Sequence, residues 1–100
     1  MRIFDENNQY ASLVRTGPDS FWAMWNTWRD RPTQVLVTHI GPEFFTPMEL
    51  LSERDGFHVN PAGAASNGVM RFFWLEINGG CTRVMTRVHD GEFGDEKVLS

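Results

Sequence analysis

The run Phe21–Trp28 carries three of the four tryptophans of this chain and most constrains how it can fold. On a helical wheel at about 100° per residue, its large apolar side chains share one arc, while small and polar side chains fill the other. Gly17-Pro18-Asp19 suits a helix N-terminus, and Pro32 suits a helix stop. The pattern predicts an amphipathic helix over residues 18–30. Trp22 lies at the rim of the apolar arc, where it is either buried or a contact residue.

The remaining sequence predicts a mixed fold. Strands are predicted at Arg2–Phe4, Gln9–Val14, Gln34–Ile40, Val69–Ile77 and Thr82–His89. The third of these is apolar on both faces, which favours a central position in its sheet. Thr46-Pro47-Met48-Glu49 is a capping-box pattern and predicts a short second helix to about Asp55. The stretch Asn60–Gly68 is rich in Pro, Ala, Gly, Ser and Asn, which predicts a loop.

These elements predict an α+β fold. We expect a single small domain over residues 1–100, with a largely antiparallel sheet of four or five strands. Two helices would cover it, the first of them rich in tryptophan, and the chain would end in a β-hairpin.

Asn78-Gly79-Gly80 between the last two strands predicts that hairpin, and a two-residue turn, either Asn78-Gly79 or Gly79-Gly80, decides which side chains share a face. One face is then predicted to be the core, with Phe73, Leu75, Ile77, Thr82, Val84, Thr86 and Val88. The opposite face holds Met70, Phe72, Trp74, Glu76, Arg83, Met85, Arg87 and His89. A three-residue turn would change this pairing.

The opposite face combines aromatic, methionine and arginine side chains, a composition enriched at protein interfaces. We therefore expect it to bind a partner protein. The candidate partner-binding residues are Phe72, Trp74, Arg83, Met85, Arg87 and Trp22. The alternative is that a helix covers the two aromatic side chains, while the arginines reach water at its edges.

The net charge of −4 argues against nucleic acid as a partner and favours another protein with a basic surface. No apolar run approaches the ~20 residues that a membrane span needs. The first residues, Met1–Glu6, lack the apolar segment of a signal peptide. The chain is therefore expected to be a complete cytoplasmic protein that does not contact membranes.

Few residues of this chain suggest a catalytic or metal-binding role. Cys81 is the only cysteine, so it forms no internal disulfide, and no local signature pairs it with a histidine base. The acidic stretch His89–Glu96 could hold a divalent cation, but its spacing does not match an EF-hand loop. We expect a structural cysteine and a solvated acidic tail, whose charge could engage basic residues of a partner. No cofactor and no metal are predicted.

The sequence thus predicts a protein-interaction module without catalytic activity. Its size and acidity are typical of accessory proteins of phages or mobile elements that bind and inhibit a larger host complex. Such a complex would handle nucleic acid or act in defence, and the inhibitor would work in the host cytoplasm. The alternatives are a homo-oligomeric structural protein, such as a homodimer, and a small enzyme that uses Cys81 or the His89/Asp90 region.

Overall fold

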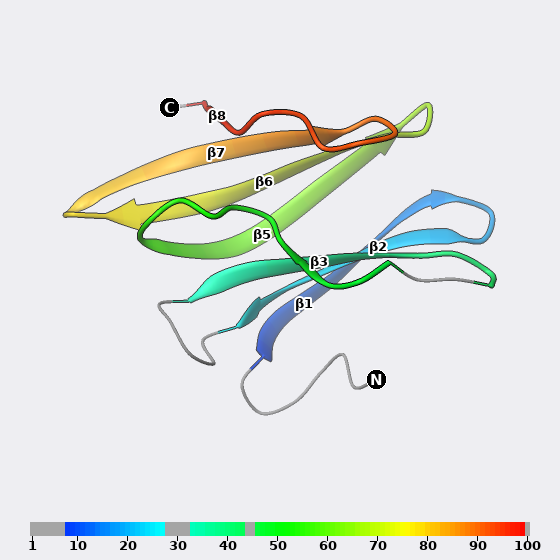
Figure 1. Ribbon diagram of the computed structural model, residues 1–100, viewed down its shortest axis with the longest axis horizontal. Helices are drawn as coiled ribbons and strands as arrows, with labels where there is room; N and C mark the ends of the chain where they lie inside the picture. Colours follow the sequence, from blue (N-terminus) through cyan, green and yellow to red (C-terminus); the bar gives the residue numbers. More distant parts are fainter. Residues whose placement is uncertain (1–7, 28–32, 44–45, 100) are drawn as a thin grey trace.

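A computed structural model describes residues 8–27, 33–43 and 46–99, and for residues 8–11 it describes the backbone alone. These residues form two four-stranded antiparallel sheets (Figure 1). The first sheet holds, in order, β1 (Asn8–Gly17), β2 (Ser20–Thr27), β3 (Gln34–Ile40) and β4 (Glu49–Leu50). The second holds β5 (Phe57–Ser66), β6 (Val69–Asn78), β7 (Cys81–His89) and β8 (Lys97–Val98).

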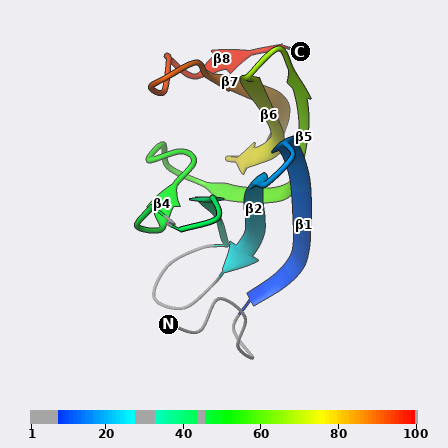
Figure 2. The same cartoon turned by 90° about the vertical axis from the view of Figure 1, so that its right-hand side faces the viewer.

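The two sheets lie one above the other as two layers (Figures 1 and 2). β5 joins them, because it pairs with β6 and also packs against β1, β2 and β3. Backbone hydrogen bonds also attach β5 and the segment after β4 to residues in and beside β3. The amide of His58 donates to the carbonyl of Thr33 at 2.7 Å, and the amide of Leu51 donates to the carbonyl of Val35 at 2.9 Å.

The predicted α+β class is wrong, because the described residues contain strands and no helix. The antiparallel pairing that we expected is present, in two sheets instead of one. Three of the predicted strands are confirmed as β3, β6 and β7, and Gln9–Val14 lies within β1. The strand predicted at Arg2–Phe4 falls outside the described residues. No segment of the described chain forms a helix that could cross a membrane.

The tryptophan-rich run is a strand, not the helix predicted over residues 18–30, of which 28–30 lie outside the described residues. Gly17-Pro18-Asp19 belongs to the turn of the β1–β2 hairpin, and glycine and proline serve such turns as well as helix starts. Ala23, Asn26 and Thr27 would have formed the polar side of the helix, yet they are buried. β2 is therefore a central strand, enclosed by β1 and β3 and buried along most of its length.

The second predicted helix is also absent, because Thr46 is held by β3 and cannot cap a helix. Its hydroxyl accepts the backbone N–H of His39 at 2.9 Å, and its carbonyl accepts the hydroxyl of Thr38 at 2.6 Å. The segment then follows β3 and contributes only the short strand β4.

Most of the predicted loop Asn60–Gly68 belongs to β5. Asn67 and Gly68, both at positive φ, make the tight turn into β6.

The hydrophobic core lies between the two sheets. Its buried residues are Trp22, Met24, Val35, Val37, Leu51, Met70, Phe72, Trp74 and Met85. Trp22 of β2 meets Phe72 of β6 edge to face, with ring centroids 5.2 Å apart, a favourable geometry for two aromatic rings. Because residues 8–27, 33–43 and 46–99 form no helix, these side chains are the main source of apolar burial between the layers.

We predict that Trp74→Ala lowers the free energy of unfolding by about 3–5 kcal/mol, because truncation leaves a cavity in this core. Only 1% of Trp74 is exposed. Urea unfolding followed by circular dichroism measures the change. Leu13→Ala is the matched control, since Leu13 is 64% exposed and its truncation should change the free energy by less than about 0.5 kcal/mol. Equal effects of the two substitutions would contradict this placement of the core.

Candidate functional site

The structure reverses the two faces of the β6–β7 hairpin. Asn78 pairs with Cys81 and Trp74 with Met85, so the turn is Gly79-Gly80, one of the two predicted two-residue turns, and the predicted grouping of side chains into two faces is correct. However, Phe72, Trp74 and Met85 are buried between the sheets and do not face a partner. Trp22, for which burial and partner contact were both open, is buried with them. The expectation that this face looks outward is therefore wrong.

The arginines of that face lie at its rim, as the alternative interpretation expected, although a sheet and not a helix covers the aromatic side chains. Arg87 is half-buried and donates from Nε to the carbonyl of Gly94 at 2.7 Å and from Nη1 to that of Leu51 at 3.0 Å. Its guanidinium also lies 4.6 Å from the centre of the Phe93 ring. These contacts allow the charged guanidinium group of Arg87 to lie at the edge of the hydrophobic core. Arg83 is exposed.

The face that we predicted as core points away from the first sheet. We call the outward side of β5, β6 and β7 the outer face. By register and alternating burial, its large apolar side chains are Phe57, Val59, Phe73, Leu75, Ile77, Val84 and Val88. Phe57 is 49% exposed and Ile77 is 37% exposed. The second sheet is therefore apolar on both sides.

One end of the outer face carries side chains of both charges. Arg71 is exposed at one end, where a hollow of about 150 Å³ is lined by Arg71, Lys97 and Asp95 among others. Asp55 is exposed in the segment before β5. Its backbone carbonyl accepts a hydrogen bond from the side-chain amide of Asn78 at 3.3 Å, and by alternation Asn78 is on the same side of β6 as Glu76.

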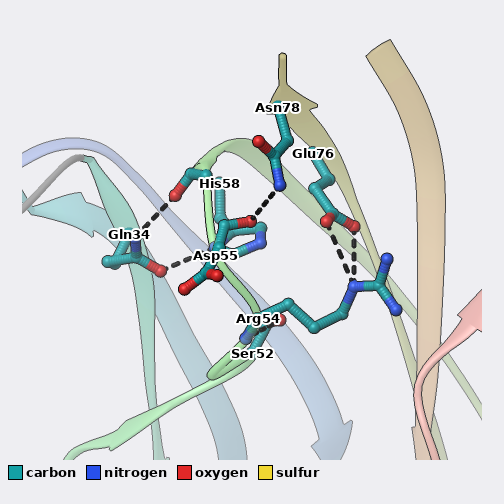
Figure 3. Close-up of polar contacts among 8 residues, drawn as sticks. Gln34, Ser52, Arg54, Asp55, His58, Glu76 and Asn78 are labelled. Atoms are coloured by element: carbon teal, nitrogen blue, oxygen red, sulfur yellow. Dashed lines mark hydrogen bonds and ion pairs between the residues drawn. The ribbon is translucent and has the colours of Figure 1, made fainter. Parts of the chain in front are cut away.

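A polar cluster is buried where β5 meets the first sheet (Figure 3). The side chain of Glu76 is 2% exposed, and its two carboxylate oxygens share the single N–H of Arg54 Nε in a bifurcated hydrogen bond, at 3.0 and 3.1 Å. The side chain of Gln34 bridges His58 and the carbonyl of Gly56, at 2.6 and 2.9 Å. The cluster thus ties the segment before β5 to β3 on one side and to β6 on the other.

The hydrogen bonds of Gln34 determine which ring nitrogen of His58 carries the proton. Because its amide nitrogen donates to Gly56, its oxygen faces the ring and accepts from Nδ1 of His58. Nε2 of the neutral ring is then an acceptor, and it is buried without a hydrogen-bond partner among the described residues. Burial lowers the pKa of His58 and Arg54 lowers it further, whereas Glu76 and Glu96 oppose that shift. The ring is therefore neutral at physiological pH.

A second histidine is built into an aromatic cluster. His39 stacks on Trp22 with ring centroids 4.6 Å apart, and His89 meets the same indole edge to face at 4.9 Å. Nε2 of His39 lies 2.7 Å from the hydroxyl of Ser20, which accepts a hydrogen bond from Thr16 at 2.8 Å. Burial and, to a smaller extent, His89 lower the pKa of His39. A neutral His39 can accept the Ser20 proton, so the chain of bonds fixes both side chains.

An acidic cleft of about 450 Å³ opens between β4 and the segment before β8, within the size range of ligand and side-chain pockets. Its lining comprises Met48, Glu49, Leu50, Glu53, Arg87 and Glu96. The guanidinium of Arg87 already serves two backbone carbonyls, as described above. The three carboxylates suit a cationic group of a partner.

The structure does not bring together the residues that the alternative interpretation, a small enzyme, would use. Cys81 is exposed at the hairpin turn, at the opposite end of β7 from His89. His89 contacts the rings of Trp22 and Phe93. Within residues 8–27, 33–43 and 46–99, no group of three or more His, Cys, Asp or Glu side chains is arranged to hold a metal ion.

No protein-family model matches this chain, and comparison with curated proteins and with solved structures gave no match either. The candidate surfaces therefore rest on the geometry of this chain alone.

Sequence reasoning missed the outer face, the acidic cleft and the environment of His58. One signal was available, because Phe57, His58 and Val59 alternate as they would in a strand with His58 on its inner side. The partner of His58, Gln34, lies 24 positions away in the sequence, and no local pattern connects the two.

We predict that the protein loses stability as the pH falls below about 6.5, the ordinary pKa of histidine. The lowered pKa values of His39 and His58 mean that the unfolded chain binds protons more readily than the native protein. The free energy of unfolding therefore falls with pH until the native pKa values are passed. Urea unfolding between pH 8 and pH 5 measures this loss.

The matched variants for this experiment are His39→Gln and His58→Gln. Each should be less stable than the wild type at pH 8 but should lose less free energy of unfolding between pH 7 and pH 5. Losses as steep as that of the wild type in both variants would show that other groups cause the acid sensitivity.

Proposed function

We propose that this protein is a protein-interaction module without catalytic activity, and that the outer face is its main contact surface. One observation carries the proposal: the second sheet places large apolar side chains on its outward side, with Phe57 and Ile77 substantially exposed. Contiguous exposed apolar surface of this kind commonly marks a protein-binding site. Fully burying one such side chain contributes about 1.5–3 kcal/mol, so a few anchors can support a complex.

A second surface suits a different part of a partner. The acidic cleft can accept a lysine or arginine side chain, and the net charge of −4 favours the approach of a basic surface. These features support the proposal that the module binds and inhibits a larger complex with such a surface, for example one that handles nucleic acid. We place this action in the cytoplasm, where the exposed thiol of Cys81 would stay reduced.

We predict that the double variant Phe57→Lys/Ile77→Lys loses its protein partner, because two charges would interrupt the apolar surface. The tagged protein is incubated with extract of the native host cell, and captured proteins are quantified by mass spectrometry. Proteins held through the outer face should be depleted at least about tenfold by the double variant, which corresponds to about 1.4 kcal/mol.

Leu13→Lys is the matched control, because Leu13 is an exposed apolar residue on β1, in the other sheet. Circular dichroism verifies that all variants are folded. A set of captured proteins that is the same for wild type and double variant would remove the outer face as the contact surface.

A further inference from the structure

We infer that His39 and His89 form an acid-sensitive contact between the two sheets, and that protonation of both rings releases residues 90–96. His39 belongs to β3 in the first sheet and His89 to β7 in the second. The inference goes beyond the proposed function, because it concerns a conformational change of the protein itself. It also differs from the acid sensitivity of global stability, since one segment is released while both sheets stay folded.

The contact consists of rings from both layers around one indole. His39 stacks on Trp22 with ring centroids 4.6 Å apart, and His89 meets the same indole edge to face at 4.9 Å. The centroids of the two imidazoles are 6.5 Å apart, and both side chains are half-buried. Two positive charges at this distance repel each other across the interface, and a partly buried pair is only weakly screened by salt and water.

At neutral pH this repulsion is absent. Burial lowers the pKa of His39 below its ordinary value of 6.5, and the charge of a protonated His89 lowers it further. His39 is therefore neutral at pH 7, and its Nε2 can accept the hydroxyl of Ser20, 2.7 Å away. Because that hydroxyl can also accept a hydrogen bond, Ser20 does not prevent protonation of His39. As the pH falls, the second proton on the pair meets the charge of the first.

The charged groups around the pair do not offset its second charge. Asp90 and Glu92 follow His89 along the chain, but both are exposed to water, which screens them. The guanidinium of Arg87 lies 4.6 Å from the centre of the Phe93 ring, which itself contacts His89, so it adds a positive charge to this region. The residues next to the pair on β2 and β6 are uncharged, namely Ser20, Trp22 and Met70.

The segment that follows His89 depends on this cluster for its position. Phe93 meets His89 edge to face with centroids 4.9 Å apart and pairs with its backbone in an isolated β-bridge. Next to this bridge, the amide of Gly94 donates to the carbonyl of Val88 at 2.8 Å. Repulsion that displaces the His89 ring therefore loosens Phe93 and the hydrogen bond of Gly94. The same segment carries Glu96 to the acidic cleft, so its release alters that cleft.

Hydrogen exchange measured by NMR tests this inference. The amide of Gly94 reports release of the segment, and the amides of the central strands β2 and β6 report global unfolding. Between about pH 7.5 and pH 5, the protection factor of Gly94 should fall at least about tenfold more than theirs. That factor corresponds to a difference of about one unit in histidine pKa between the closed and released forms.

Removal of either charge should abolish the release. His89→Phe keeps a ring in the aromatic cluster but cannot be protonated, so the amide of Gly94 should stay protected at pH 5. His39→Gln removes the other charge and should have the same effect. His58→Gln is the matched control, because His58 is buried in a different cluster, with Gln34. This variant should release the segment in acid as the wild type does.

Three results would overturn the inference: a wild type whose Gly94 amide stays protected at pH 5, equal losses of protection at Gly94 and in β2 and β6, or the wild-type loss in both His89→Phe and His39→Gln. Circular dichroism verifies that the variants are folded, and if one of them is not, the other provides the same comparison. These measurements involve no partner, so a negative result would leave the proposed function unaffected.

Discussion

The contact between the two sheets is the interaction on which the rest of this structure depends. Phe72 and Trp74 of β6 pack against Trp22 and Met24 of β2, and this packing holds together two layers that the described chain otherwise joins mainly through β5. Because methionine is flexible and the rings are rigid, the methionines fill the irregular spaces that the rings leave. All candidate surfaces follow from this contact: it sets which side of the second sheet is outward, and it brings β4 near the segment that carries Glu96.

The parts of the fold that could be predicted are those specified by neighbouring residues. The hairpin of β6 and β7 is encoded by Asn78-Gly79-Gly80, and the structure has a two-residue turn with Gly79 and Gly80 at positive φ. β3 is recognisable because Gln34–Ile40 is rich in β-branched residues and is bounded by a Gly-Pro pair. In both cases a strong local preference agrees with the tertiary structure.

The parts that could not be predicted depend on distant partners. Aromatic side chains spaced for a helix in Phe21–Trp28 are equally compatible with a strand that is buried on both faces, and only β1 and β3 decide between the two. Likewise, Arg83 and Arg87 made the inner face of the β6–β7 hairpin resemble a protein interface, because the sequence does not reveal that Arg87 donates to the carbonyls of Gly94 and Leu51. The candidate site was misplaced for that reason: the grouping of side chains into two faces was right, but which face is covered is a property of the whole chain.

A strand that is apolar on both faces has a consequence for how its alignment is specified. In most half-buried sheets, a shift by one residue moves apolar side chains into water, and that cost enforces the correct pairing. In β6 such a slip would exchange Phe72 and Trp74 for Phe73 and Leu75, one apolar row for another. Discrimination between the two alignments must then come from the rigid glycine turn and from Glu76, which would leave its guanidinium partner if the strand moved. The buried charge of Glu76 therefore helps to specify the strand alignment of a sheet whose hydrophobic pattern alone is ambiguous.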